Sequence, residues 1–154
     1  MITMTQLSKR MQKYSVAVEA AVNKIVQKTA LLVDQVVVSS TPVDTGKARS
    51  NWLPSLGGPR NGTIPPYVPY PSYADPVKFG ESGNAQGAID AARLVVGARS
   101  KSSEDIYIRN SVHYISDLND GNSRQAPAGF VQMAVQAASA SIQTSAGRIL
   151  KEHL

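Results

Sequence analysis

The fold of this chain of 154 residues is decided by the stretch Pro42-Val43-Asp44-Thr45-Gly46-Lys47-Ala48-Arg49-Ser50-Asn51-Trp52, which joins a long helical pattern to an alternating one. After Gly46, small or aromatic residues alternate with charged and polar ones as far as Trp52, the period of a half-exposed strand with the Trp52 side chain turned inward. Pro54 ends this pattern or marks a sheet edge, because proline cannot donate a ladder hydrogen bond. We therefore expect a strand over residues 48–52, directly after a turn.

The turn has a structural explanation in three of its residues. The Asp44 carboxylate can accept backbone N–H bonds, and Gly46 can take a positive φ angle. Arg49 can pair with Asp44 or with a carboxylate of a neighbouring molecule. On this interpretation none of the three needs a catalytic role.

Asp44-Thr45-Gly46 is also the tripeptide that carries the catalytic carboxylate of aspartic proteases. Those enzymes bring two carboxylates together so that one holds a proton while the other activates water, and each loop lies between apolar strands. Here a helical pattern precedes the tripeptide, Lys47 and Arg49 follow it, and no second apolar-apolar-glycine segment is present. We expect no enzyme, and keep a protease that uses Asp44 as an alternative.

Upstream of the turn, apolar residues recur at intervals of three and four from Leu7 to Val36. This spacing predicts one long amphipathic helix. At 1.5 Å per residue the helix would span roughly 45 to 50 Å, more than a small domain needs, so part of it can pack on a second subunit. The alternative is a plain core helix. The valines at 36–38 and the approach to Pro42 supply the stop.

Downstream, residues 54–83 are expected to form an extended arm or loop. Seven of the nine prolines fall between Pro54 and Pro76, which excludes an ordinary helix or central strand. Tyr67, Tyr70 and Tyr73 recur every third residue, so a polyproline II helix would place their rings on one ridge. That ridge can dock on a neighbour, or the tyrosines can fold back on their own domain.

The remaining pattern completes an α+β layout. Asn84 is expected to cap a short middle helix that stops at Gly97, and residues 105–110 are expected to form a strand that pairs with the strand of Trp52. A second long helix is expected to begin at Pro127, a residue tolerated in a first turn. The prediction is a single domain, 1–154, in which two long helices brace a small antiparallel or mixed sheet.

The composition leaves few chemical tools. The chain has no cysteine and only His113 and His153 as histidines, so disulfides, thiolate zinc sites and cysteine nucleophiles are excluded. Neither a phosphate-binding glycine loop nor a metal-spaced cluster is present, and we expect no cofactor and no metal.

The formal net charge is +5, with basic residues spread along the chain. Such a charge permits contact with DNA, but it is also ordinary for a small domain, so a DNA-binding module stays an alternative. Polar residues such as Gln12 and Lys13 interrupt the apolar run near the start, and we expect neither a signal peptide nor contact with a membrane.

The opening stretch resembles a motif of the tail-completion and neck proteins of long-tailed bacteriophages, the minor tail protein Z type. The family pattern is Pro-Val-Asp-Thr-Gly, a basic residue, then an Arg and a Trp. The matching residues are Pro42, Val43, Asp44, Thr45, Gly46, Lys47, Arg49 and Trp52.

A second match lies far downstream and keeps the family's order: a strand with Tyr and Asn, a Tyr-Ala-x-x-Leu-Glu-x-Gly element, then Ser-Arg-Gln-Ala-Pro and the last helix. The matching residues are Tyr107, Asn110, Tyr114, Leu118, Gly121, Ser123, Arg124, Gln125, Ala126, Pro127 and Gly129. Asn119 stands where the family has Glu, and Ser116 sits one place beyond the Ala expected at Ile115. An ion pair made by that Glu is therefore not implied here.

The resemblance implies a structural virion protein in the neck, at the head-proximal end of the tail, assembled in the host cytoplasm. Copies form a ring, expected to be a hexamer, that binds the tail terminator or tail tube protein and the head-completion or neck proteins. Genome DNA passes through the lumen without sequence-specific binding. A head-side stopper or adaptor in the same neck is the alternative.

The expected contact surfaces are the long first helix, the three tyrosines of the arm and the turns of the two motifs. The motif residues expected to shape or make subunit contacts are Pro42, Asp44, Thr45, Gly46, Arg49, Trp52, Tyr107, Asn110, Tyr114, Leu118, Gly121, Ser123, Arg124, Gln125, Pro127 and Gly129.

Overall fold

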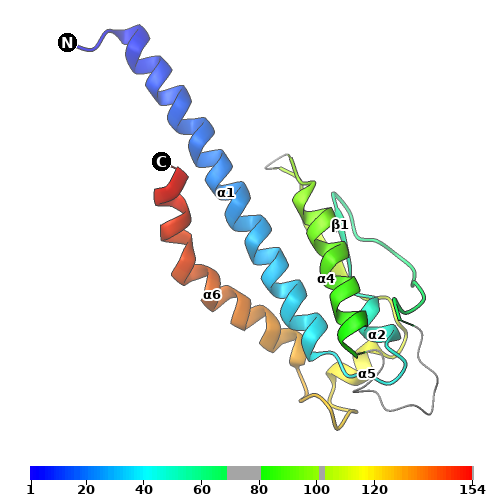
Figure 1. The fold of residues 1–154 in the computed structure, drawn as a ribbon. Helices are drawn as coiled ribbons and strands as arrows, with labels where there is room; N and C mark the ends of the chain where they lie inside the picture. The colour runs from blue at the N-terminus through cyan, green and yellow to red at the C-terminus, as the bar shows by residue number, and fades with distance from the viewer. Residues whose placement is uncertain (69–80, 101–102, 154) are drawn as a thin grey trace.

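Two long helices and a small sheet make up the fold (Figure 1), given by a computed structural model that describes residues 1–68, 81–100 and 103–153. In chain order the described elements are α1 (Met4–Ser40), α2 (Lys47–Ser50), β1 (Leu53–Leu56), α4 (Glu81–Gly97), β2 (Ile106–Arg109), α5 (Ile115–Asn119) and α6 (Phe130–His153). In the described residues the sheet is antiparallel and pairs β1 with β2. The expected α+β class with long first and last helices is confirmed in outline.

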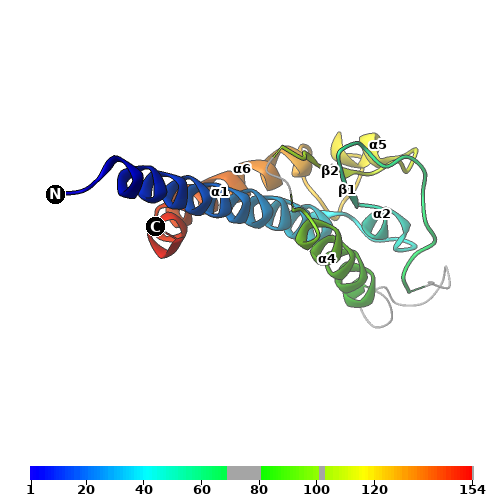
Figure 2. The ribbon, with the colours of Figure 1, turned by 90° about the horizontal axis from the view of Figure 1, so that it is seen from above.

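Helix α1 is longer at both ends than the predicted Leu7–Val36. It begins with a capping box, in which the Thr3 hydroxyl accepts from the Gln6 backbone N–H at 3.2 Å and the Gln6 side chain accepts from the Thr3 N–H at 3.0 Å. It ends at Ser40, where the predicted stop before Pro42 is confirmed. Its first turns extend past every other helix (Figures 1 and 2).

The core forms where α4 and α6 run back along the lower half of α1 (Figure 1). Alanines dominate the facing surfaces of α4 and α6, and small side chains let helix axes approach closely. Larger groups fill the centre of the cluster. Its buried members are Val37, Val38, Trp52, Ala88, Ala126, Phe130 and Ala134.

The predicted strand over residues 48–52 is wrong. Residues 47–50 form a helical turn, α2, and the strand begins at Leu53 and includes Pro54. Its partner was predicted correctly, because Leu53 lies opposite Arg109 in the register of β1 and β2. Pro54 is tolerated because a two-stranded ribbon leaves each strand with an unpaired edge. Side-chain bonds made from α2, described below, outweigh the alternating pattern.

Other boundaries differ in informative ways. Asn84 does not cap the middle helix: α4 begins at Glu81, and Asn84 is fully buried inside it. The last helix begins at Phe130 and not at Pro127, and the short α5 was not predicted. The stop at Gly97 is confirmed.

The predicted arm over residues 54–83 is described only in part. Tyr70 and Tyr73 lie outside the described residues, so the tyrosine ridge stays a prediction. The Tyr67 ring folds back on its own chain, because a Cβ added at Gly87 would come within 2.5 Å of it. Burial raises the pKa of the Tyr67 phenol, with Arg60 lowering that pKa and Asp34 raising it.

Asp34 is a buried acid near the middle of the fold. Its exposed fraction is 1%, and both carboxylate oxygens are buried without a hydrogen-bond partner. Burial raises the pKa of Asp34 from 3.8 to about 7, because an unpaired carboxylate is costly away from water. The fold therefore favours the protonated acid.

This burial makes stability depend on pH. Because the folded pKa lies above the unfolded value, the stability is fully present below about pH 3.8 and is lost as the pH rises through about 7. We expect the free energy of unfolding to fall by up to ~1.4 kcal/mol per pH unit across that window. In Asp34→Asn this fall should disappear, whereas in Asp117→Asn, an exposed control on α5, it should persist. Urea denaturation at several pH values measures the free energy of unfolding. The same dependence of this free energy on pH in wild type and Asp34→Asn would contradict the raised pKa of Asp34.

Candidate functional site

The C-terminal end of α1 is capped by Arg49, which α2 presents to it. The Arg49 guanidinium donates to the Thr41 carbonyl at 2.8 and 3.2 Å and to the Ser39 carbonyl at 3.3 Å. The last carbonyls of a helix lack partners within the helix and carry partial negative charge, which a buried cation offsets. These bonds make Arg49 a cap of the helix end, and Asp44 is exposed.

Trp52 is fixed to the same helix end. Its indole N–H donates to the Thr41 hydroxyl at 2.7 Å, and that hydroxyl donates to the Val37 carbonyl at 2.6 Å. The exposed fraction of Trp52 is 7% and that of Thr41 is 0%. Within one copy Trp52 is therefore a core residue that shapes the turn, and its indole is not available as a contact surface.

Gln125 joins the two sequence motifs. Its side-chain carbonyl accepts from the Val43 backbone N–H, and its amide group donates to the Val43 carbonyl, each at 2.9 Å. The side chain thus pairs with Val43 much as a neighbouring strand would. Residues 82 positions apart meet here, so the two motifs form one unit, which we call the motif junction.

The motif junction surrounds a hollow of about 410 Å³. It lies between the loop after α1, α2, α5 and the loop before α6. The predicted site residues that line it are Pro42, Asp44, Thr45, Gly46, Tyr114, Leu118, Ser123 and Gln125. A neighbouring hollow of about 500 Å³ is lined by Pro42, Arg49, Gln125 and Pro127 among others.

Tyr114 lines this hollow, and its phenol has a shifted pKa. Burial raises the pKa of the Tyr114 phenol above its ordinary value, and the negative charge of Asp44 raises it further. Hydrogen bonding to the Thr45 side chain and to the Ala48 backbone lowers the same pKa. The phenol is therefore anchored on the first motif and stays neutral at physiological pH, as a structural hydrogen-bonding group does.

Asn110 and Tyr107 extend the second motif in different directions. The Asn110 side chain donates to the Ala48 carbonyl at 2.8 Å and accepts from the Val112 N–H at 3.1 Å, so it ties α2 to the end of β2. Tyr107 lies away from the motif junction, in a groove between β2 and α1. The structure therefore brings Asn110 to the junction but not Tyr107.

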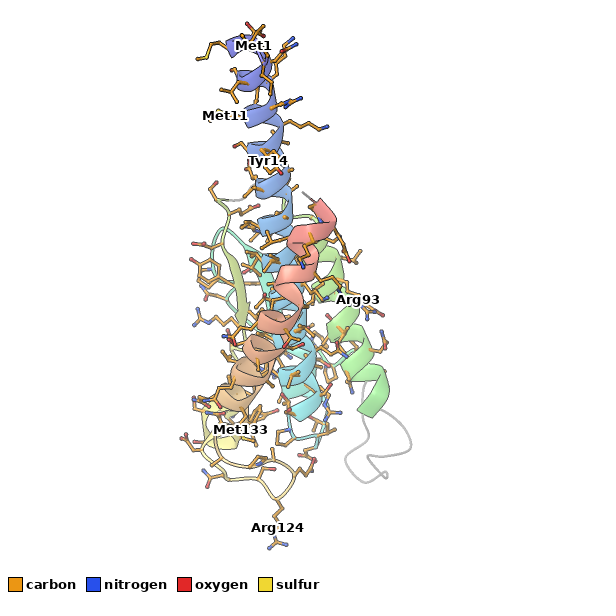
Figure 3. The ribbon with its side chains drawn as sticks, turned by 90° about the vertical axis from the view of Figure 1, so that its left-hand side faces the viewer. Met1, Met11, Tyr14, Arg93, Arg124 and Met133 are labelled. Atoms are coloured by element: carbon orange, nitrogen blue, oxygen red, sulfur yellow. The ribbon has the colours of Figure 1, made fainter. Side chains whose placement is uncertain are left out.

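The loop before α6 is built on two glycines and one asparagine. Gly121 has φ +94° and Gly129 has φ +75°, which L side chains rarely adopt. Asn119 caps α6 by accepting from the Val131 N–H at 3.0 Å. Arg124 is exposed at the outer end of this loop (Figure 3).

Sequence reasoning missed the buried roles of two asparagines, Asn51 and Asn84, which fix the opposite side of the turn. Asn51 accepts from the Ile64 N–H at 2.7 Å and donates to the Ile64 carbonyl at 2.9 Å. Asn84 pairs with the backbone of Val68 in the same way, at 2.8 and 3.1 Å. The signal available was a polar residue within an apolar helical pattern, which is ambiguous between a cap and a buried bond.

Asn84 also explains Gly46. The φ angle of Gly46 is +77°, as expected, and a Cβ there would lie 2.2 Å from the Asn84 side-chain nitrogen. Only glycine satisfies both the conformation and the close approach.

Chemically, the motif junction is a set of hydrogen-bonded turns. Within the described residues, no group of three or more His, Asp, Glu or Cys side chains gathers where it could hold a metal. None of the helices in the described ranges combines the length and hydropathy that a bilayer crossing requires. The arrangement presents a fixed surface with the exposed charges of Asp44 and Arg124 at its margin.

Comparison with protein-family models, curated proteins and solved structures finds no match to this chain.

The bonds of Gln125 predict a measurable loss of stability. Gln125→Ala removes both bonds to Val43, each worth about 1 kcal/mol, so the free energy of unfolding should fall by about 1–2 kcal/mol. Gln125→Glu should cost at least as much, because a carboxylate would face the Val43 carbonyl. Chemical denaturation measures both against Gln143→Ala, an exposed position on α6. Equal stability of the Gln125→Ala and Gln143→Ala variants would show that the two motifs are not joined this way.

Proposed function

We propose that this chain is a structural virion protein of a long-tailed bacteriophage. Copies form a ring at the head-proximal end of the tail, where the ring completes the tail and supports head–tail joining. The proposal rests on the resemblance of two separated motifs to those of tail-completion and neck proteins. The observation that carries it furthest is the paired bonding of Gln125 to Val43, because it makes both motifs parts of one surface.

The motif residues divide into two roles. Buried members, such as Arg49 and Trp52, hold the shape of the turn from inside. Exposed members, such as Asp44 and Arg124, lie at the margin of the motif junction, where they can meet a neighbouring ring. Charged margins select partners and orient encounter more than they add affinity. This division fits an assembly surface whose outline is fixed before binding.

The motif residues have structural hydrogen-bond partners within the described part of the chain. Asp44 lies in a loop between α1 and α2, whereas the catalytic loops of aspartic proteases lie between strands. The hydrogen bonds of Tyr114, Gln125 and Asn110 go to backbone or side-chain groups of the same junction. A scaffold for subunit contacts accounts for these features, and we place the function in assembly.

Particles made with altered junction charge test the proposal. Arg124→Glu reverses an exposed charge without touching the core, so the chain should fold normally while filled heads and separate tails accumulate. Arg93→Glu is the matched control, because Arg93 is also exposed but lies on α4 (Figure 3), in a surface pair of small energy. Electron microscopy counts joined and unjoined particles. Normal joining in particles that lack this chain would refute the neck role, and labelling on the head side would favour the stopper or adaptor.

The protease alternative predicts that Asp44→Asn blocks cleavage of a virion protein, whereas the assembly proposal predicts no effect on processing. Asp44→Asn keeps the size of the side chain and removes the carboxylate, so we expect processing of all structural proteins to be unchanged in infected cells. Gel electrophoresis of purified particles measures this. Accumulation of one uncleaved virion protein, with particle assembly otherwise intact, would instead assign Asp44 a catalytic role.

A further inference from the structure

The first turns of α1 carry an apolar stripe that this chain leaves exposed. We call it the tip seam: Met4, Leu7, Met11, Tyr14 and Val18. These positions alternate in spacings of three and four, so they lie on one face of the helix. Met11 is 65% exposed and Tyr14 is 60% exposed, and both lie on the part of α1 that projects from the body (Figure 3). A row of large apolar side chains in water favours a partner.

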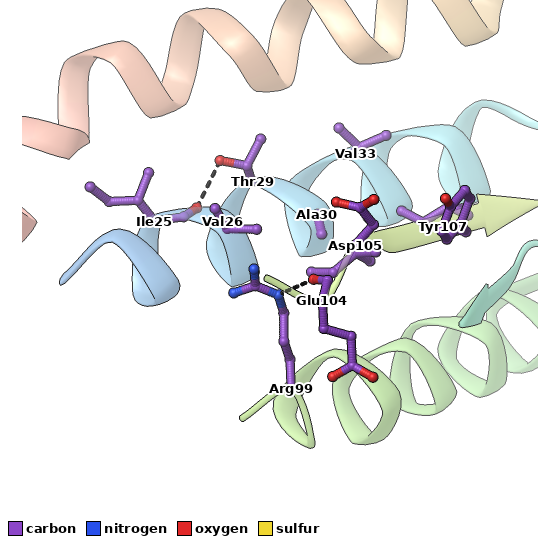
Figure 4. A pocket seen from close by; sticks show the side chains of 11 residues that line it. Ile25, Val26, Thr29, Ala30, Val33, Arg99, Glu104, Asp105 and Tyr107 are labelled. Atoms are coloured by element: carbon purple, nitrogen blue, oxygen red, sulfur yellow. Dashed lines mark hydrogen bonds between the residues drawn. The ribbon is translucent and has the colours of Figure 1, made fainter. Parts of the chain in front are cut away.

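A second apolar surface lies lower on the same molecule. We call it the β2 groove, a hollow of about 740 Å³ between α1 and β2 (Figure 4). Its walls are mainly aliphatic and aromatic, with Val26, Ala30 and Val33 from α1 facing Ile106 and Tyr107. A hollow of this size accommodates several large side chains. In the described sheet β2 is paired with β1 alone.

The tip seam and the β2 groove of one molecule cannot meet. The groove is lined by residues 25–33 of α1, and the tip seam lies at residues 4–18 of that same continuous helix. Bringing them together within one chain would require breaking α1, with the loss of its backbone hydrogen bonds. The tip seam of the same chain is therefore excluded as an occupant of the groove, and only the tip seam of another copy can reach it.

The charges beside the tip seam and the β2 groove are opposite in sign, which favours a second copy as the occupant of the groove. Arg10 flanks the tip seam, and Asp105 is exposed at the groove. The cation in the groove wall, Arg99, is 6% exposed and donates to the Glu104 carbonyl at 2.7 Å and to Asn23. The acidic groups are thus the more accessible charges of the groove. A basic helix edge against an acidic groove margin favours one orientation of docking.

We propose that the tip seam of one copy docks in the β2 groove of the next. The two surfaces differ, so the contact is heterologous, and repeated heterologous contacts close into a ring when the rotation permits. The inference rests on the proposed function for its setting, because it names the contact that would hold the proposed ring together. The contact itself is a property of the purified chain.

Self-association of the purified chain is the first test. The wild type should form oligomers by analytical ultracentrifugation, and Met11→Asp should weaken the association by about tenfold or more, because a charge enters a buried contact. Val16→Asp is the matched control: Val16 is 63% exposed, close to the 65% of Met11, but lies off the tip seam. Circular dichroism checks that each variant keeps its helices. A monomeric wild type, or equal loss in both variants, would overturn the proposal.

Mixing two defective variants identifies which surfaces touch. Ala30→Trp fills the half-buried groove wall, so this variant keeps a tip but offers no groove, whereas Met11→Asp keeps a groove but offers no tip. Each alone should be monomeric, and their mixture should form a one-to-one pair through the remaining intact contact. A mixture that stays monomeric would overturn docking of tip in groove. Self-association of Ala30→Trp alone would also overturn it, because that variant keeps its tip and tip-to-tip pairing gives that result.

A charge exchange between Arg10 and Asp105 is a further test of the contact. Arg10→Glu and Asp105→Lys should each weaken association, and the two substitutions in one chain should restore it. Additive losses in the double variant would exclude the proposed orientation. These solution results are independent of head–tail joining: oligomers in solution with normal joining in particles lacking the chain would refute the neck role alone, and monomers with defective joining would refute the docking alone.

Discussion

The C-terminal end of α1 is the point on which the rest of the structure depends. A helix leaves its last carbonyls without internal partners, and burying them unpaired is costly. Here the Arg49 guanidinium and the Thr41 hydroxyl satisfy carbonyls of the last turns. For Arg49 to reach them, the chain must reverse direction within a few residues. That requirement explains the left-handed Gly46, the single turn of α2 and the inward Trp52.

Around this point, amide side chains hold the irregular segments. Gln125, Asn51 and Asn84 each pair with both backbone groups of one distant residue. Such pairing gives a loop the hydrogen bonds that a sheet would otherwise supply. It also fixes the position of the loop where no strand is formed. Amide side chains and the buried Arg49 and Trp52 therefore fix the outline of this region together.

The sequence predicted the features that depend on local physics. The long α1, its stop before Pro42, the positive φ of Gly46 and the stop at Gly97 each follow from one residue type and its backbone preference. The antiparallel partner of the strand was also predicted, although the strand was displaced.

The predictions that failed concern residues whose conformation is set by contacts with distant parts of the chain. Residues 48–52 alternate like a strand, but Arg49 and Trp52 both bond to the end of α1, and only a helical turn allows this. Asn84 has the residue type of a helix cap, but its partner is Val68, which no local rule identifies. The inward-facing Trp52 was predicted and is confirmed, but local rules do not show which motif residues stay exposed, as Arg124 does.

The length of α1 has a geometric consequence. Its 37 residues span about 55 Å at 1.5 Å per residue. The exposed tip lies at one end, and the motif junction lies at the other. Because α1 is one uninterrupted helix, its length fixes the distance between the exposed tip and the motif junction.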